Sequence, residues 1–254
     1  MTRIEPRWLV VERVSVPLKR LPPELDGLQI AHLSDLHLGP DVKVEAIAEA
    51  VARTMSLQAD LIVLTGDYVT RRASYAPGLV EPLSRLNAPL GVYATLGNHD
   101  HWAGAEKVAS HLSRAGITVM KNLAQPIARD GAALWLLGLD DVWFGTGHLP
   151  TALAGVPQDA CKIVLIHEPD FADRSARYGI DLQLSGHSHG GQVRIPGIGP
   201  LILPDWGRKY PMGLQRAGET WVYTTRGVGL VSPAIRFNCP PEITLLTLRR
   251  ARDG

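Results

Sequence analysis

The 254-residue chain contains only two cysteines, Cys161 and Cys239, which lie far apart in the sequence. Two cysteines are too few for a disulfide framework, and their positions show no metal-binding spacing. We therefore expect both to be buried apolar side chains, the commonest environment of an unpaired cysteine.

Long apolar runs are also missing. The longest early one, Trp8 to Val11, is shorter than the core of about 7 to 15 residues that a secretory signal requires, and nothing resembles a membrane-spanning helix. The chain as it stands predicts a cytoplasmic protein. An extracytoplasmic or membrane-associated protein would show the same pattern if an N-terminal segment had been removed.

Neither sign of charge is in excess. Lys and Arg total 26 and Asp and Glu total 25, which gives a formal charge of +1. The chain as a whole therefore offers no general attraction for nucleic acid or anionic lipid, and we expect no nucleic-acid partner.

The sequence does contain five short apolar runs, each followed at once by Gly, Asp, Asn or His. The runs are 28–33, 61–64, 92–96, 163–166 and 182–184. We interpret them as buried strands with a polar cluster at each C-terminal end. Apolar residues at helical spacing over 44–55 and 108–115 predict helices between strands. In such βαβ arrangements ligands bind beyond the carboxyl ends of the strands, so the clusters are expected to converge.

Further strand candidates at 133–139, 221–225 and 243–248 suggest a second sheet packed against the first. The residue pattern thus predicts a layered α/β sandwich, and the length is compatible with one domain over residues 1–254. Segment 193–213 is rich in Gly and Pro and predicts a long loop or small flap.

The polar clusters supply residue types that bind metal ions. The candidate ligands are Asp35, His37, Asp67, Asn98, His167, His187 and His189. Side chains two apart on an extended segment point the same way, so each D-x-H or H-x-H pair can form a clamp. Asp67 is the best placed carboxylate to bridge two cations. Two carboxylates and two divalent cations leave a charge of about +2, or about +1 with a bound hydroxide, which attracts an anion and suits in-line phosphoryl hydrolysis.

His99 follows Asn98 directly and is itself followed by Asp100. An imidazole oriented by a carboxylate can protonate a leaving alkoxide at the edge of a metal pair. We therefore predict catalytic roles for His99 and Asp100.

Together these motifs resemble those of the calcineurin-like metallophosphoesterases. The residues that carry the resemblance are Asp35-Leu36-His37, Gly66-Asp67, Gly97-Asn98-His99-Asp100, His167 and Gly186-His187-Ser188-His189. The resemblance implies a four-layer sandwich of two mixed β-sheets flanked by helices. It also implies two divalent metal ions, Mn, Fe or Zn, among which this ligand set does not choose. One ion would take Asp35, His37, Asp67 and His189, and the other would take Asp67, Asn98, His167 and His187.

Over residues 26–248 the sequence is most similar to a bacterial branch of this family that includes the phosphodiesterases YkuE and YaeI and the UDP-2,3-diacylglucosamine pyrophosphatases. The marks of the branch are His167-Glu168-Pro169-Asp170, Gly186-His187-Ser188-His189-Gly190-Gly191-Gln192 and Arg236-Phe237-Asn238-Cys239-Pro240-Pro241-Glu242. This likeness implies hydrolysis of phosphodiesters by metal-bound hydroxide.

Two alternatives stay open. The first, from the same branch, is a pyrophosphatase acting on a lipid-linked nucleotide such as UDP-2,3-diacylglucosamine. The second is a non-catalytic metal-binding interaction scaffold, although such proteins tend to lose ligands and this chain fills every motif position. The expected partner is a small-molecule or lipid-linked phosphoester, with peripheral membrane contact as a further alternative.

Several other residues keep two interpretations. Asp140-Asp141 either faces the same cleft or forms a turn. Arg226 and Arg194 either bind a phosphate oxygen or are surface charges. His32 is expected to pack within its strand, whereas His101 either contacts substrate or does not take part.

The apolar and aromatic residues outside the strands are equally open. The segment 198–203 with Trp206 either holds an acyl chain, rests against a membrane or closes a core. Trp102 and Trp143 either line the entrance to the site or pack beneath it.

Overall fold

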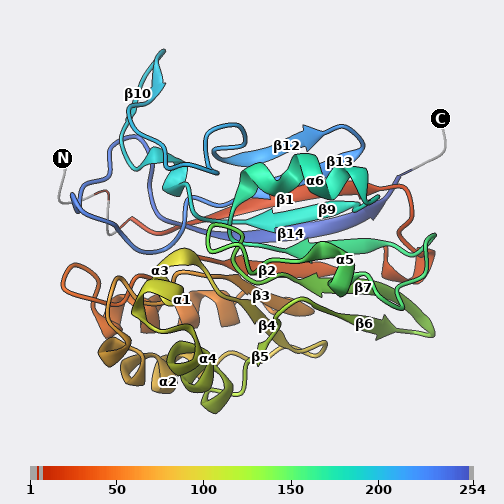
Figure 1. Ribbon diagram of the computed structural model, residues 1–254, viewed down its shortest axis with the longest axis horizontal. Helices are drawn as coiled ribbons and strands as arrows, with labels where there is room; N and C mark the ends of the chain where they lie inside the picture. Colours follow the sequence, from red (N-terminus) through yellow and green to blue (C-terminus); the bar gives the residue numbers. More distant parts are fainter. Residues whose placement is uncertain (1–4, 6–7, 252–254) are drawn as a thin grey trace.

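Two six-stranded β-sheets form the centre of the computed structural model, which describes residue 5 and residues 8–251 (Figure 1). The first sheet has the order β1-β14-β2-β3-β4-β5, and all neighbours in it are parallel except β14 and β2. Its strands are Val10–Leu18 (β1), Glu242–Arg250 (β14), Gln29–Leu33 (β2), Leu61–Thr65 (β3), Val92–Thr95 (β4) and Thr118–Val119 (β5).

The second sheet has the order β12-β13-β9-β8-β7-β6. Its four central strands are parallel, and the edge strands β12 and β6 are antiparallel to their neighbours. The strands are Gly213–Ala217 (β12), Thr220–Thr224 (β13), Leu182–Ser185 (β9), Lys162–Leu165 (β8), Ala132–Gly138 (β7) and Leu123–Arg129 (β6).

Helices cover the outer face of each sheet. Residues of α1, α2 and α4 pack on the first sheet, and those of α5 and α6 pack on the second. The α-helices are Val44–Met55 (α1), Pro77–Leu83 (α2), Asn98–Ala103 (α3), Ala105–Arg114 (α4), Leu149–Ala152 (α5) and Ala172–Arg177 (α6). Single 3₁₀ turns occur at Pro23–Leu25 (η2), Ala73–Tyr75 (η3), Pro169–Phe171 (η4) and His189–Gly191 (η5).

Strand β3 shows how the sequence produces these layers. Its side chains alternate, so that Ile62 and Leu64 face the helices while Leu61 and Val63 face the second sheet. Both faces are buried, which is why a parallel strand of this kind reads as an unbroken apolar run. Helix α1 instead buries one stripe, in which Ile47, Ala50, Val51 and Thr54 recur at helical spacing. The predicted sandwich of two mixed sheets flanked by helices is confirmed.

The assignment of strands to sheets was partly wrong. Strand β14, expected in the second sheet, lies in the first between β1 and β2. Strands β8 and β9, expected in the same sheet as β2 and β3, belong to the second sheet. An apolar run predicts that a strand is buried, but its periodicity does not name the neighbouring strand. The single domain over residues 1–254 stays a prediction, and residues 1–4, 6–7 and 252–254 lie outside the described residues.

The segment predicted as a loop or flap contains a short antiparallel hairpin. Its strands are Arg194–Ile195 (β10) and Gly199–Pro200 (β11). Figure 1 shows this hairpin projecting from the body of the molecule. None of the helices among residues 8–251 combines the length and the apolar character needed to cross a membrane.

Candidate active site

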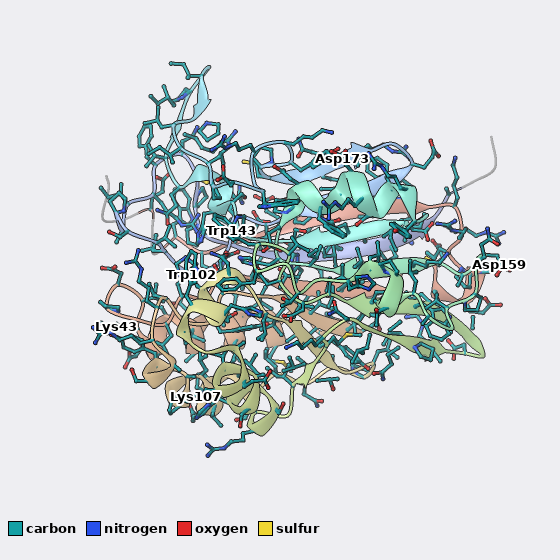
Figure 2. All side chains as sticks on the ribbon, in the orientation of Figure 1. Lys43, Trp102, Lys107, Trp143, Asp159 and Asp173 are labelled. Carbon is teal, nitrogen blue, oxygen red and sulfur yellow. The ribbon has the colours of Figure 1, made fainter. Side chains whose placement is uncertain are left out.

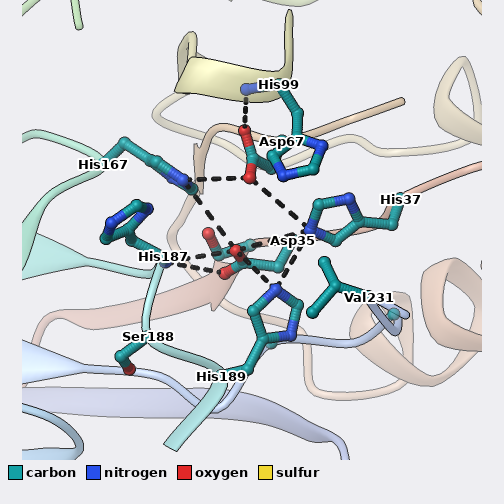
Figure 3. A network of polar contacts seen from close by, with 12 residues as sticks. Asp35, His37, Asp67, His99, His167, His187, Ser188, His189 and Val231 are labelled. Carbon is teal, nitrogen blue, oxygen red and sulfur yellow. Dashed lines mark hydrogen bonds and ion pairs between the residues drawn. The ribbon is translucent and has the colours of Figure 1, made fainter. Parts of the chain in front are cut away.

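The seven candidate ligands lie together where parallel strands of both sheets end. They follow β2, β3 and β4 in the first sheet and β8 and β9 in the second. Each is buried, with at most 6% of its surface exposed. Figure 3 shows six of them, with His99, gathered around one centre. The expected convergence therefore occurs, although two sheets rather than one supply the residues.

Asp35, His37 and His189 form one group of closely placed ligand atoms. The two imidazole Nε2 atoms of His37 and His189 face each other at 3.0 Å. Asp35 Oδ1 lies 3.3 Å from His189 Nε2 and 3.9 Å from His37 Nε2. Both Asp35 oxygens also accept the backbone N–H of His187, at 3.1 and 3.2 Å, which fixes the carboxylate in place.

The carboxylate of Asp67 lies between ring nitrogens from the two sheets. Its Oδ2 is 3.2 Å from His167 Nε2 and 3.5 Å from His37 Nε2. Its Oδ1 accepts the backbone N–H of His99 at 2.9 Å. One oxygen of Asp67 is thus oriented by the protein while the other faces both histidines, which is the arrangement that a bridging ligand needs.

Hydrogen bonds to backbone carbonyls fix the tautomers of His167 and His187. A carbonyl oxygen only accepts, so the ring nitrogen that contacts it must carry the hydrogen. His167 Nδ1 donates to the Thr65 carbonyl at 2.6 Å, which leaves Nε2 directed at Asp67. His187 Nε2 donates to the Asp205 carbonyl at 2.8 Å, which leaves Nδ1 as its free lone pair.

This donor set fits divalent cations. The Oδ1 atom of Asn98 is buried without a hydrogen-bond partner, and the Nε2 atom of His167 lies 3.2 Å from the Asp67 carboxylate. In neutral rings, lone pairs facing a carboxylate or each other repel unless a proton or cation lies between them. Carboxylate oxygen, imidazole nitrogen and amide oxygen are together tolerated by Mn, Fe and Zn. His187 is not part of the three-residue groups found among the described residues.

Burial sets the protonation of the histidines. It lowers the pKa of His37 and of His187 to about 3 and that of His189 well below its usual value. These rings are therefore neutral at pH 7, the form that binds metal. Burial acts in the same direction on His167, but the Asp67 carboxylate outweighs it and raises the pKa of His167.

The carboxylates respond to burial in the opposite direction. Burial raises the pKa of Asp35 to about 7. It acts likewise on Asp67, but the neighbouring His167 and His99 outweigh it and hold the pKa of Asp67 well below its usual value. Without a cation, the site therefore keeps Asp67 ionised while Asp35 holds a proton at slightly acid pH.

The backbone at the ligands is not extended, contrary to the geometry expected for the two clamps. Asp35, His37, Asp67, His187 and His189 have φ values of 54°, 49°, 58°, 69° and 51°. This left-handed conformation costs energy in non-glycine residues and is common at functional sites. Backbone hydrogen bonds of 2.9 Å hold it, from Asp35 N to Gly66 O and from His37 N to Asp67 O. The paired residues do converge, but through loop geometry rather than strand alternation.

Asp100 does not orient the imidazole of His99, which corrects the expected dyad. Its carboxylate accepts backbone N–H groups instead, from Asp67 at 2.8 Å, Tyr68 at 2.9 Å and Gly97 at 3.0 Å. Asp100 is the third residue of α3 and reaches back to the residue that caps the helix. The His99 ring is oriented by the Thr70 carbonyl, to which its Nδ1 donates.

The other histidines and aspartates considered from the sequence form hydrogen bonds with protein groups. His32 is buried and its Nε2 contacts Thr65 Oγ1 at 2.8 Å. His101 Nε2 contacts Asp140 Oδ1 at 2.8 Å, and Asp141 Oδ1 accepts the Phe144 N–H at 2.7 Å as a turn residue does.

The two arginines considered for phosphate binding have protein partners of their own. Arg226 forms ion pairs with Glu12 at 2.6 Å and Glu242 at 2.7 Å. Arg194 Nη1 donates to the Gly190 carbonyl at 3.0 Å. These contacts favour structural roles for both side chains.

Sequence reasoning did not identify the contribution of Arg236. This fully buried side chain donates to the carbonyls of Arg226 at 2.7 Å, Gly229 at 2.8 Å and Cys239 at 3.0 Å. Gly229 N in turn donates to the Asp35 carbonyl at 2.7 Å. Arg236 therefore clamps the loop that packs against Asp35. The only signal in the sequence is its place in a motif, because its carbonyl partners depend on loop geometry.

A cavity of about 680 Å³ opens above the centre, within the usual range for ligand pockets. Asp67, Asn98 and His99 lie in its wall, together with Trp102 and Trp143. The centroids of the two indole rings are 6.2 Å apart and the rings meet edge to face; Figure 2 labels the two residues near each other. The tryptophans therefore line the entrance, the first of the two interpretations given for them.

Comparisons with known proteins agree with this geometry. A model of the calcineurin-like phosphoesterase family matches residues 28–191. The uncharacterized metallophosphoesterase YkuE of Bacillus subtilis is 34% identical over 250 residues, 97% of this chain and 87% of YkuE. The phosphodiesterase YaeI of Escherichia coli is 38% identical over 225 residues, 87% of this chain and 82% of YaeI. The crystal structure of TT1561 of Thermus thermophilus shares the fold, with a TM-score of 0.55 at 14% identity, over 80% of this chain and 90% of that chain.

Gly97 tests how closely the centre is packed. A methyl group on its Cα would lie 2.8 Å from His167 Cδ2 and would press on Asp67 Oδ1. We expect Gly97→Ala to weaken metal binding by about 10–100-fold, as other displacements of supporting groups do, while the protein stays folded. Metal titration and circular dichroism measure both. The matched control is Gly78→Ala, where the methyl group meets the flexible end of Leu38 at 3.1 Å. Equal metal affinity in the two variants would contradict this packing argument.

Metal affinity should depend on pH through Asp35. The cation binds the ionised carboxylate, and the pKa of Asp35 in the metal-free protein is raised to about 7 by burial. Affinity should therefore fall as the pH is lowered below about 7, by about tenfold per pH unit for each proton displaced. Calorimetric titration in buffers of different ionisation enthalpy measures the protons released. An affinity that stays constant between about pH 6 and 8 would show that no proton is displaced.

Proposed function

The chain belongs to the calcineurin-like phosphoesterase family and is a hydrolase of phosphate esters, and from this premise we propose that it hydrolyses phosphodiesters at a centre of two divalent cations. The observation that carries the proposal is the position of Asp67 Oδ2, between His167 Nε2 at 3.2 Å and His37 Nε2 at 3.5 Å. A carboxylate oxygen held between two such ligands is suited to bridge two ions.

Each cation would take its own set of side chains. The first would be held by Asp35, His37, Asp67 and His189, and the second by Asp67, Asn98, His167 and His187. The close grouping of Asp35, His37 and His189 supports the first set. The tautomers of His167 and His187 and the unpartnered amide oxygen of Asn98 support the second. The proposal covers Mn, Fe and Zn and does not choose among these metals.

A pair of divalent cations supplies positive charge that acidifies water and clamps a phosphoryl group. The protein's own part in proton transfer falls to His99. Because Nδ1 donates to the Thr70 carbonyl, the imidazolium form has its second hydrogen on Nε2, available to the leaving oxygen. His99 lines the cavity, and its ring packs on Trp102 at 4.5 Å between centroids. Asp100 contributes by holding the Asp67 loop.

The preference for diesters is the finer part of the proposal. It is supported by the similarity to a relative named as a phosphodiesterase and by a cavity that extends well beyond the centre. The scaffold alternative is disfavoured because all seven candidate ligands and His99 are present. Among the described residues that line the cavity, Arg71 alone carries a permanent positive charge, so a polyanionic nucleic acid is not the favoured substrate.

Hydrolysis of bis(p-nitrophenyl) phosphate and p-nitrophenyl phosphate tests the function directly. Chelator-treated protein should regain turnover when Mn²⁺, Fe²⁺ or Zn²⁺ is restored, and should act faster on the diester. Asp67→Ala should abolish turnover because it removes the bridge. A folded, metal-loaded protein that hydrolyses neither ester with any of these ions would overturn the proposal.

His99→Ala tests the general acid. We expect a loss of about 10²–10⁴-fold for esters with poor leaving groups and a much smaller loss for p-nitrophenyl esters, with both cations still bound. The matched control is His101→Ala, whose ring contacts Asp140 at 2.8 Å and does not line the cavity. Equal losses for good and poor leaving groups would remove His99 from this role.

A further inference from the structure

The cavity above the metal centre continues into an apolar groove with two separate walls. The segment that follows the β10–β11 hairpin forms one wall, with Leu201, Ile202 and Pro204. The other wall is formed by Val231 and Pro233. Val231 lies beside His189 and His37 in Figure 3, so the groove begins at the candidate ligands themselves.

Gln192 joins the two walls at their base. This buried amide donates to the carbonyls of Val231 at 3.0 Å and Pro233 at 3.2 Å, and it accepts the Val231 N–H at 2.9 Å. On the other side Gly191 holds the hairpin, since a methyl group there would lie 2.5 Å from Pro200 Cβ. Gly191 and Gln192 both follow His189 in the motif that begins at Gly186. Neither is a candidate metal ligand, so the metal centre does not explain their place in the motif. The groove is therefore a built feature, fixed to the segment that carries His189.

The apolar side chains at the tip of the hairpin and directly after it do not close a core. Ile202 is 78% exposed, Ile198 at the tip is 75% exposed and Leu201 is 57% exposed. Contiguous exposed apolar surface of this kind commonly marks a binding site. Trp206 is the exception in this segment, because it packs against the core beneath the second sheet.

We propose that this groove binds the hydrocarbon chain of an amphiphilic phosphoester whose phosphate lies at the Asp67 centre. The inference rests on the proposed function, since it assigns the substrate class of the same site. The chain would run from the centre past Val231 and between Ile202 and Pro233, while the tryptophans cover the opposite side of the phosphate. Apolar contact is roughly proportional to the area removed from water, so affinity should rise with chain length.

The position of the groove favours this occupant over a macromolecule. A folded partner or a second copy seated on the hairpin would cover the opening through which a substrate reaches the centre. The scarcity of positive charge in the cavity wall argues against nucleic acid. A hydrocarbon chain attached to the phosphate fills the groove and keeps the centre accessible.

Binding of n-octyl phosphate and methyl phosphate to the Mn²⁺-loaded protein tests the proposal by calorimetry, without relying on turnover. We expect n-octyl phosphate to bind at least about tenfold more tightly than methyl phosphate. The double variant Leu201→Ser/Ile202→Ser should bring this ratio toward one, whereas Ile202→Leu should retain it. Thermal melts followed by circular dichroism verify that the variants are folded.

The matched control is Tyr178→Ser, which replaces a 47%-exposed apolar residue at the end of α6, away from the groove. It should leave the ratio unchanged. Equal affinity for the two phosphates in the unaltered protein, or an undiminished ratio in the double serine variant, would overturn the proposal. So would a concentration-dependent dimer that the double variant abolishes without changing the ratio, because the face would then belong to a second copy.

Turnover of bis(p-nitrophenyl) phosphate separates this inference from the proposed function. An octyl preference without turnover would leave the groove assignment standing and remove the phosphodiesterase. Turnover with no octyl preference would support the phosphodiesterase and remove the groove assignment.

Discussion

The position of the Asp67 carboxylate is the constraint on which the rest of the site depends. One of its oxygens is held by the His99 N–H at 2.9 Å, and the other faces ring nitrogens that come from different sheets. The loop that carries it is held by Asp100, which accepts the N–H groups of Asp67 and Tyr68. Gly97 leaves room for this arrangement, because any side chain there would push on the carboxylate. Helix α3 thus contains both Asn98, a candidate ligand, and Asp100, which holds the loop that carries Asp67.

This centre lowers the stability of the folded protein when no cation is bound. Five ligand residues have left-handed backbone, and several buried polar atoms have no partner within the described protein. Strained backbone and unpaired polar groups persist only where the surroundings determine them strongly. Here the surroundings are hydrogen bonds such as those of Arg236, which ties together the loop that packs on Asp35. A cation that binds only the folded form adds its binding free energy to that of folding, so occupancy and stability are linked.

The sequence predicts local elements of this protein better than their neighbours. Helix α1 at Val44–Met55 follows from apolar periodicity and strand β3 at Leu61–Thr65 from an unbroken apolar run, because burial acts on each side chain separately. Strand pairing depends on the whole chain, and for that reason β14 was assigned to the wrong sheet. The candidate ligands could be chosen by residue type, but the geometry that unites Asp35 with His37 could not, since it is set by loop hydrogen bonds.

Asp100 shows a different reason for error. Adjacent residues of a helix point in different directions, so Asp100 was never suited to contact the ring of His99. Only one half of a capping box forms, because Gly97 has no side chain: the Asp100 carboxylate accepts the Gly97 N–H at 3.0 Å. Arg236 had no signal in its local spacing, because its acceptors are backbone carbonyls of any residue type.

In the proposed complex the apolar segment and the charged centre would each contact a different part of one ligand. Lowering the local dielectric strengthens the attraction between a phosphate and the cations that hold it. An apolar wall that begins at Val231, beside the ligands, has this effect in addition to any contact with a hydrocarbon chain. Contact between Ile202 and a remote hydrocarbon chain would supply binding energy that can be used to place the reacting phosphate. Gln192 links the two functions physically, since the segment that it ties to the groove is the one that carries His189.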